Sequence, residues 1–598
     1  MCGIAGILTT HPYPDRLNVL ADRMQLALQH RGPDDQGIYI SSTCESVLVH
    51  TRLSILDLSA AGHQPMSTAN QRYWITFNGE IYNFQELRSQ LEAQGEQFAS
   101  RTDTEVILKL YQRMGTSCVE QLRGMFAFAI WDDWEKTCFI ARDPLGIKPL
   151  YYWQSGAMFV FASELRAVLA SGLPEKRLSS SGFYGYLTTG SVPEPQTLIE
   201  GVRTLEAGHW LRWQAGEVKQ SQYWQIEFKP QPMDASEAVA IVRQALLDSI
   251  QHHFVSDVPV GIFLSGGVDS SAVVALSRQI QSGLLNTYSI AFEEEEWNEG
   301  DLAQKVANHF GTNHTEYKIT ADLGRSLLPK FLTAIDQPSI DGFNTFCVSQ
   351  LARESGSKVV LSGLGGDELF SGYQSFQKVP RMVSWGHSLK YFQPLPALVG
   401  KGLEAWSESS QIRRLGDFLQ QTPTTMTAYR SFRGIFSHQE ACQLLHTYFP
   451  DQDQPRRQVD DSCRYPFPSL ADEISFLEIS RYMRNQLLRD SDVMSMIWGL
   501  ELRVPLVDRA LLEAIASIPS QLRLAPGKQL LTQAVPELPT WIMNRPKRGF
   551  FFPYEQWLQN EWRDYFQEIV CPNNIPLKPW YRRWSLAIFQ QWWRQIAE

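Results

Sequence analysis

The sequence contains only 8 cysteines in 598 residues, and no two of them stand close together. This spacing excludes a zinc ribbon and a disulfide framework, because both need clustered or regularly paired cysteines. We expect most of these residues to be small buried side chains. Cys2 is the exception because it directly follows Met1.

Long apolar runs and an excess of positive charge are also missing. No run approaches the ~20 apolar residues that span a bilayer, and the N-terminus lacks the basic-then-apolar pattern of a secretory signal. Lys and Arg number 54 against 64 Asp and Glu, which gives a formal net charge of -10. Nucleic acids and anionic membranes bind positive surfaces, so we expect neither partner and a cytoplasmic location.

At 598 residues and 43% hydrophobic content, the chain can bury several cores, and no internal repeat is evident. The first 225 residues consist of short strand-like runs between turn residues, with one helix predicted after Asn83, where Glu86 would complete a capping box. Helical periodicity begins again after the irregular run 228–234. We therefore place a domain boundary there.

The second half alternates strands with helices. The buried-strand run 258–264 leads through a glycine turn into the helical segment 270–276, and the run 358–361 is followed by a similar turn. This order predicts an α/β parallel sheet with ligands at the carboxyl ends of its strands. Near the C-terminus, an apolar stripe at helical spacing favours helix docking over membrane contact. Its residues are Trp584, Ile588, Trp592 and Ile596.

Cys2 becomes the first residue if Met1 is removed. A terminal α-amine titrates near pH ~7.7 and can act as general base for its own side chain, as in N-terminal nucleophile hydrolases. A lone Cys2 is more simply explained as a buried residue, but seven motifs occur in order. They are MCGIAGI (1–7), RGPD (31–34), RLSI (52–55), NGEIYN (78–83), TDTE (102–105), GMFA (124–127) and RDPLGIKPLYY (142–152). Together they resemble the glutaminase domain of class II glutamine amidotransferases over residues 2–225.

This resemblance implies an α+β N-terminal nucleophile hydrolase sandwich (αββα) with Cys2 as the catalytic nucleophile. It implies that Asn78 and the Gly79 amide stabilise the tetrahedral oxyanion. The planar fork of Arg52 is expected to bind the α-carboxylate of glutamine, and Asp103 its α-ammonium. The implied glutamine-binding residues are Arg52, Asn78, Glu80 and Asp103.

The segment SGGVDS at 265–270 follows a strand run and opens a helix. Backbone N–H groups and the helix dipole can converge on an anion at such a position. No lysine ends the loop, which excludes a Walker A phosphate loop. Taken by themselves, these six residues are also explained as a structural turn between a strand and a helix. The loop resembles the pyrophosphate loop of ATP pyrophosphatases, which adenylylate a substrate and release pyrophosphate.

Further motifs extend the likeness through the second half. They are DQP (336–338), LSGLGGDELF (361–370), RDSDVMSM (489–496), LELRVP (500–505) and RPKRGF (545–550). With them, the chain resembles the glutamine-dependent asparagine synthetase family over nearly its whole length. The resemblance implies an α/β parallel-sheet ATP-pyrophosphatase domain over residues 235–598, ATP and Mg²⁺ as cofactors, and a homodimer.

The resemblance also implies roles for single residues in this domain. The implied ATP-binding residues are Leu264, Ser265, Gly266, Gly267, Asp269, Ser270, Ile290, Ser362 and Gly363. Asp269 and Asp367 are the implied Mg²⁺ ligands, because hard carboxylate oxygens suit that ion. Lys547 is implied to neutralise charge on the adenylate or on the departing pyrophosphate.

The implied reaction hydrolyses glutamine to ammonia in the first domain and amidates a carboxylate, L-aspartate by default, through an acyl-adenylate in the second. AMP and pyrophosphate would be released. One residue departs from the pattern of bacterial asparagine synthetases, whose loop reads SGEGADE: Leu364 stands where that loop has its first glutamate. Two alternatives stay open. The acceptor could be another carboxylate, in a natural product or a cell-envelope precursor, or the second domain could be non-catalytic.

Overall fold

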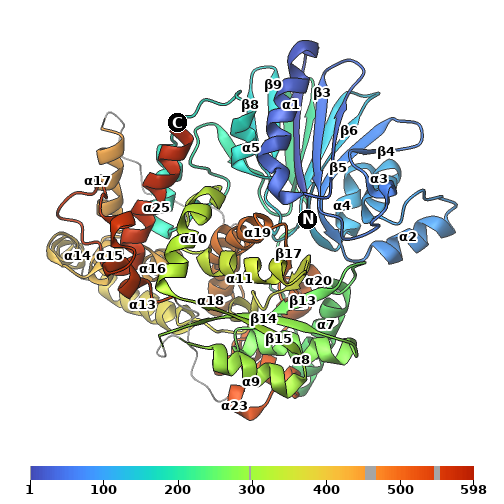
Figure 1. Ribbon diagram of the computed structural model, residues 1–598. Helices are drawn as coiled ribbons and strands as arrows, with labels where there is room; N and C mark the ends of the chain where they lie inside the picture. Colours follow the sequence, from blue (N-terminus) through green and yellow to red (C-terminus); the bar gives the residue numbers. More distant parts are fainter. Residues whose placement is uncertain (1, 295–297, 393, 451–465, 544–551, 598) are drawn as a thin grey trace.

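The computed structural model describes residues 2–294, 298–392, 394–450, 466–543 and 552–597. Its N-terminal part contains two six-stranded antiparallel sheets (Figure 1). The first has the order β10-β8-β9-β1-β3-β2, with β1 (Gly3–Thr9), β2 (Asp35–Ile40), β3 (Ser46–Arg52), β8 (Tyr151–Ser155), β9 (Met158–Ala162) and β10 (Val202–Thr204). The second has the order β12-β11-β7-β6-β5-β4, with β4 (Met66–Ser67), β5 (Tyr73–Ile81), β6 (Gly124–Asp132), β7 (Thr137–Arg142), β11 (His209–Gln214) and β12 (Glu217–Gln222).

Helices cover the outer faces of both sheets. Helices α1 (Pro14–Leu28) and α5 (Leu165–Ala170) pack on the first sheet, and α2 (Phe84–Ala93) and α3 (Asp103–Met114) lie on the side of the second. Fully buried residues of the two facing sheets, including Ile4 and Ala127, form the core between them. The predicted αββα sandwich is confirmed.

The helix predicted after Asn83 forms, but its predicted cap is wrong. The Asn83 side chain makes no capping bond to α2. Instead it accepts from the Arg123 backbone N–H and donates to the Gln121 carbonyl, both over 3.0 Å. A tertiary contact with the loop before β6 therefore replaces the local capping bond.

The C-terminal part is built on a five-stranded parallel sheet, as the alternating pattern predicts. Its order is β15-β14-β13-β16-β17, with β13 (Val260–Phe263), β14 (Asn286–Phe292), β15 (Asn313–Ile319), β16 (Val359–Leu361) and β17 (Glu501–Arg503). Helices α8 (Val268–Ile280) and α9 (Gly300–Phe310) cover one face, and α11 (Phe343–Glu354) and α19 (Arg489–Met496) the other (Figure 1). The central strands β13 and β16 are covered on both faces, which explains their apolar sequences.

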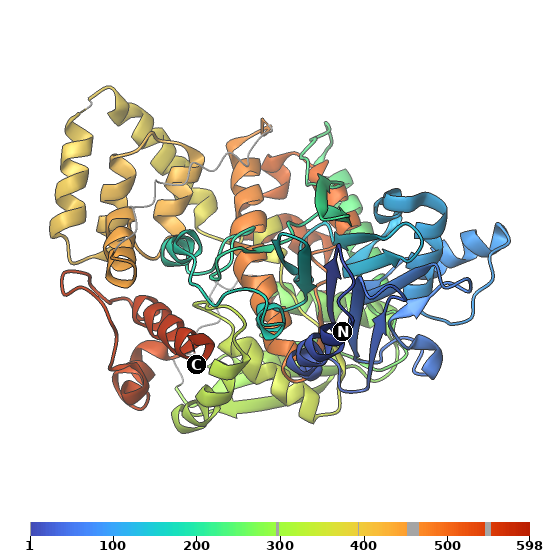
Figure 2. The same cartoon turned by 90° about the horizontal axis from the view of Figure 1, so that it is seen from above.

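Further helices surround this sheet. They are α7 (Ala235–His253), α10 (Ala321–Ala334), α12 (Gly366–Leu369), α18 (Leu470–Leu477), α20 (Arg509–Ala516), α22 (Gln529–Ala534) and α24 (Tyr554–Gln559). A separate helical lobe projects to the side (Figure 2). It contains α13 (Ser375–Lys390), α14 (Leu395–Trp406), α15 (Ser410–Leu419), α16 (Thr425–Arg433) and α17 (His438–Tyr448).

The C-terminal apolar stripe forms part of α25 (Trp580–Ala597) and packs into the protein. Trp584, Ile588 and Trp592 are buried against the main core. The helix-docking prediction is therefore confirmed. Within the described residues, no helix has both the length and the apolar character needed to cross a bilayer.

Candidate active sites

Cys2 lies directly before β1 and is held from two sides. Its backbone N–H donates to Asn78 Oδ1 over 3.0 Å, and its carbonyl accepts from Arg31 Nε over 3.0 Å. The register of β1 with β3 pairs Gly3 with Thr51, which sets Cys2 beside Arg52. The fold therefore fixes the backbone of the residue that carries the thiol.

The surroundings keep this thiol protonated at rest. Cys2 is 8% exposed. Burial raises the pKa of the thiol, and the Leu53 backbone N–H and the positive charge of Arg52 offset this only in part. A nucleophilic role for Cys2 therefore needs a neighbouring base to take the proton.

Strand β5 brings the Asn78 side chain to the backbone of Cys2. Asn78 Nδ2 is buried and has no hydrogen-bond partner within the described part of the chain. Gly79 follows with φ 154°, and a Cβ at this position would lie 2.1 Å from the Met125 carbonyl oxygen. Only glycine fits this close approach of β5 to β6. An unused donor next to a nucleophile is what stabilisation of an oxyanion requires.

Two charged residues, Arg52 and Asp103, lie near Cys2 and Asn78. The Arg52 guanidinium is fixed by the loop after β3, donating to the carbonyls of Ser59 (3.0 Å) and Asp57 (2.6 Å). Asp103 begins α3, and its Oδ2 accepts from the Ile81 N–H at the end of β5 over 2.9 Å. Burial raises the pKa of Asp103 to about 7. The structure thus places Arg52, the predicted cation, at the end of β3 beside Cys2. It places Asp103, the predicted anion, at the end of β5, the strand that carries Asn78.

A buried ionic cluster joins this site to the C-terminal part. Arg31 is fully buried and pairs with Glu164 and with Asp492 of α19, each over 2.8 Å, while Lys148 Nζ lies 3.2 Å from Asp492. The same guanidinium holds the Cys2 carbonyl. This pairing was not predicted from the sequence, although RGPD and RDSDVMSM contain both partners.

A second ionic contact crosses the boundary nearby. Arg503 of β17 lies 2.5 Å from Glu501 and 3.5 Å from Glu80 of β5. Burial and the adjacent carboxylate of Glu501 raise the pKa of Glu80. The edge strand of the parallel sheet therefore reaches the Cys2 site, where Glu80 was expected only to bind glutamine.

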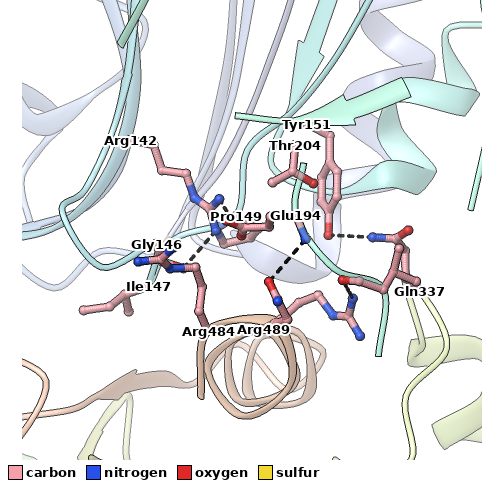
Figure 3. A pocket seen from close by; sticks show the side chains of 12 residues that line it. Arg142, Gly146, Ile147, Pro149, Tyr151, Glu194, Thr204, Gln337, Arg484 and Arg489 are labelled. Atoms are coloured by element: carbon pink, nitrogen blue, oxygen red, sulfur yellow. Dashed lines mark hydrogen bonds and ion pairs between the residues drawn. The ribbon is translucent and has the colours of Figure 1, made fainter. Parts of the chain in front are cut away.

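A small cavity of about 10 Å³ lies between the N-terminal and C-terminal parts of the chain (Figure 3). It is lined from the N-terminal part by Arg142 and Tyr151, among others, and from the C-terminal part by Gln337 and Arg489. Tyr151 accepts a hydrogen bond from Gln337 over 3.3 Å. A cavity of this size holds about one water molecule and no substrate. Its residues hold the two parts of the chain together.

Residues 264–267 form a tight loop between the carboxyl end of β13 and the start of α8 at Val268. Gly266 has φ 73°, which favours glycine, and Ser265 Oγ lies 3.0 Å from Ser270 Oγ. Gly363, just after β16, approaches so closely that a Cβ would lie 2.7 Å from the Ser270 backbone nitrogen. Ser362 and Gly363 therefore meet the N-terminus of α8, where an anion would be stabilised.

Three charges lie together beside this loop. Lys528 Nζ forms an ion pair with Asp269 of α8 and another, 2.5 Å long, with Asp367 of α12. Burial by itself lowers the pKa of Lys528, but the two carboxylates outweigh it and raise that pKa. The sequence-based prediction did not include Lys528, and only its place in the fold indicates a role. Two adjacent carboxylates fit a Mg²⁺ ion that takes its remaining ligands from phosphates and water.

The other predicted residues have less defined positions. Leu264 and Ile290 are buried in the loop and in β14, and Leu364 is a partly buried side chain packed against the main core. Lys547 lies outside the described residues.

Known families match both parts of the chain. Residues 1–224 match the family model of the glutamine amidotransferase domain, and residues 241–595 match that of asparagine synthase. Asparagine synthetase (glutamine-hydrolyzing) 1 of Bacillus subtilis is 33% identical over 583 residues, covering 95% of this chain and 90% of the relative. The putative asparagine synthetase of Mycobacterium tuberculosis is 32% identical over 554 residues, covering 89% and 84%.

Asparagine synthetase B (glutamine-hydrolyzing) of Escherichia coli is 34% identical over 405 residues, covering 64% of this chain and 66% of the relative. One family model spans more than half of the chain, and the Bacillus subtilis relative aligns over nearly its full length. The chain therefore belongs to the glutamine-hydrolysing asparagine synthetase family, whose members are ATP-dependent carbon–nitrogen ligases.

Proposed function

We propose that this enzyme makes L-asparagine from L-aspartate, MgATP and glutamine. The observation that carries the proposal is that one chain contains two separate arrangements. In the first, the backbone of Cys2 is hydrogen-bonded to Asn78, whose Nδ2 donor is unused. In the second, the glycine loop lies beside Asp269. The first arrangement suits amide hydrolysis, and the second suits handling of a nucleotide phosphate.

In the first step, the Cys2 sulfur attacks the side-chain amide carbon of glutamine. After removal of Met1, the Cys2 α-amine takes the thiol proton and passes it to the departing nitrogen, which leaves as ammonia. Asn78 Nδ2 and the Gly79 N–H stabilise the tetrahedral oxyanion, while Arg52 and Asp103 hold the two charged groups of the amino acid. Water then hydrolyses the thioester to glutamate and restores the thiol.

Glutamine binding should strengthen as pH rises through 7. Asp103 has a pKa raised to about 7, so it is mostly protonated at pH 6 and cannot pair with an ammonium. In a Cys2→Ala background, which removes thiol titration, we expect the affinity for glutamine to be about tenfold higher at pH 8 than at pH 6, as followed by calorimetry. Asp103→Asn should bind weakly at both pH values, with a flat profile. Equal wild-type affinity at pH 6 and 8 would contradict this role.

In the second step, the aspartate side-chain carboxylate attacks the α-phosphorus of ATP and displaces pyrophosphate. The loop 265–267 and the N-terminus of α8 bind the phosphates, and Lys528 balances their charge. Asp269 and Asp367 would hold Mg²⁺, which neutralises phosphate charge. Ammonia then attacks the aspartyl carbon and releases AMP, with Lys547 proposed to stabilise the developing charge.

An internal route for ammonia fits the placement of the two sites. Glu501, whose charge acts on Cys2, pairs in register with Val359 of β16, while Gly363 contacts the nucleotide loop. Val359 and Gly363 are four residues apart along the chain, with the end of β16 at Leu361 between them. Ammonia escaping to solvent would be protonated and lose its nucleophilicity, so a route beside β16 and β17 preserves it.

We expect Asp492→Asn to weaken glutamine hydrolysis more than ammonia use. The change leaves the buried Arg31 charge with one carboxylate fewer, and Arg31 holds the Cys2 carbonyl. Steady-state assays should show glutaminase kcat reduced by roughly tenfold or more, about 1.4 kcal/mol, with ammonia-dependent synthesis changed less than twofold.

A matched control is Glu513→Gln, which removes an exposed charge at the same boundary, where Glu513 Oε1 accepts from Trp224 Nε1 (2.8 Å) and pairs with Arg509 (2.9 Å). It should leave both activities unchanged. Equal losses of the two activities in a folded Asp492→Asn protein would argue against a role in positioning Cys2.

Product analysis tests the proposed function directly. The enzyme, MgATP, L-aspartate and glutamine labelled with ¹⁵N in the amide should give ¹⁵N-asparagine, AMP and pyrophosphate, detected by mass spectrometry. Formation of ADP and phosphate, or no nucleotide cleavage, would refute the proposal. Because Leu364 departs from the family pattern, the identity of the acceptor needs its own test. A panel of other carboxylates therefore belongs in the same assay. A labelled amide formed only on one of these would replace aspartate as the acceptor.

A further inference from the structure

The helical lobe, whose first helices are the yellow ones at the left of Figure 2, carries many exposed apolar side chains. Among the described residues, 16 large hydrophobic side chains are exposed, and half of them lie between 385 and 412. We call these the outer apolar face. They are Trp385, Tyr391, Phe392, Leu395, Leu398, Val399, Trp406 and Ile412.

Helix α14 turns large apolar side chains toward solvent, unlike an ordinary surface helix. Its buried side consists of Pro396, Gly400 and Glu404, and Gly400 approaches α15 so closely that a Cβ would lie 2.5 Å from the Gly416 carbonyl. Its exposed side carries Leu398 and Trp406, the latter 86% exposed. A surface helix normally turns its large apolar side chains inward. Here Pro396, Gly400 and Glu404 make the internal contact, and the large apolar side chains face outward.

Part of the face forms one open hollow. Leu398, Val399 and Trp406 of α14 line a shallow hollow together with Ile412 of α15. Tyr391 and Phe392, between α13 and α14, extend the same apolar sequence and are 90% and 65% exposed. Exposed contiguous apolar surface of this kind marks an interaction site. Its shallowness suits a broad surface better than an inserted peptide.

Positive charge predominates in the same segment, although the whole chain has a net charge of -10. Within the described residues of the segment 375–412, the exposed cationic side chains are Lys378, Arg381, Lys390 and Lys401, with His387 also exposed. The exposed acidic side chain there is Glu408. Lys378, Arg381 and Trp385 stand three, then four residues apart on α13, so they share one side of that helix.

We propose that the outer apolar face docks this enzyme onto an anionic lipid surface, with Trp and Tyr side chains at the headgroup level and lysines on the phosphates. Apolar area with basic flanks is the combination that interfacial helices use. Two copies of the face would bring like charges together, which disfavours self-association through it. The whole-chain charge predicts no membrane partner, and the local distribution of charge reverses that prediction for this face.

Vesicle flotation of the full-length enzyme tests the proposal. The protein should float with phosphatidylcholine vesicles containing about 30% phosphatidylglycerol and remain behind with pure phosphatidylcholine. Lys390→Gln with Lys401→Gln should weaken binding about thirtyfold, because each removed charge costs roughly fivefold. Leu398→Ser with Trp406→Ser should lower it at least tenfold by removing apolar contact.

A matched pair of changes, Lys176→Gln with Lys219→Gln, removes two exposed lysines from the N-terminal part and should leave flotation unchanged. All variants should keep glutamine-dependent activity and thermal stability, since both pairs lie outside the candidate sites. Failure of the wild type to float with anionic vesicles would overturn the proposal, as would unchanged flotation of both face variants. A concentration-dependent dimer abolished by Trp406→Ser would assign the face to a second copy instead.

Discussion

Cys2→Ala is expected to abolish asparagine formation from glutamine while leaving formation from ammonium salts intact. The sulfur is the proposed attacking atom, and removing a catalytic nucleophile costs roughly 10³-fold or more. The proposed synthetase site lies on a separate sheet with its own loop, so we expect added ammonia to bypass the loss. Glutaminase activity and both modes of synthesis can be measured on the same preparation.

Cys571→Ala provides the matched control, because this half-buried cysteine lies outside both candidate sites. It should behave as the wild type in all three assays. Glutamine hydrolysis that persists in Cys2→Ala would refute the nucleophile assignment. Loss of ammonia-dependent synthesis in a folded Cys2→Ala protein would refute the separation of the two sites.

Lys528→Met is expected to reduce pyrophosphate release by about 10²–10³-fold, the range for removing one preorganised electrostatic contact. The lysine lies between Asp269 and Asp367 beside the nucleotide loop, so its loss leaves two carboxylates without their shared cation where phosphates would arrive. Glutaminase activity should remain within about twofold, since Lys528 contacts none of the residues around Cys2.

The control for this change is Lys318→Met, which removes an exposed lysine 3.7 Å from Glu293. Thermal unfolding of both variants checks that the fold survives. Pyrophosphate release within threefold of the wild type in Lys528→Met would exclude the proposed role. Lys528→Arg should recover part of the lost rate if charge alone is required, and none if the position of the ammonium group matters.

Most of the fold was predictable because its elements have local signatures. The strand around Phe128 and the buried strand before Ser265 are marked by apolar runs between turn residues, and both form as β6 and β13. The α25 stripe is marked by helical spacing. The Asn83 cap failed because a competing partner, the Arg123 N–H, is 40 residues away in the chain. Local reasoning cannot weigh a partner that only the tertiary fold supplies.

The candidate sites divide in the same way. The positions of Asn78 beside Cys2 and of Ser270 beside Gly363 agree with roles implied by motif resemblance, which remain proposals for this chain. Lys528 gave no such signal, because a lone lysine after a glycine is ordinary in any sequence. The separation of 259 positions along the chain places the contact of Asp269 with Lys528 beyond any local pattern.

The amino-acid sequence by itself determined the two sheet types, their order along the chain and the family, because periodicity and ordered motifs are properties of neighbouring residues. The tertiary structure alone decided the contact of Arg31 with Asp492, the Lys528 ion pairs and the outward turn of Leu398 and Trp406 on α14. The physical reason is that burial and ion pairing depend on which distant segments pack together. The same side chain is core, bridge or surface according to what the fold sets against it.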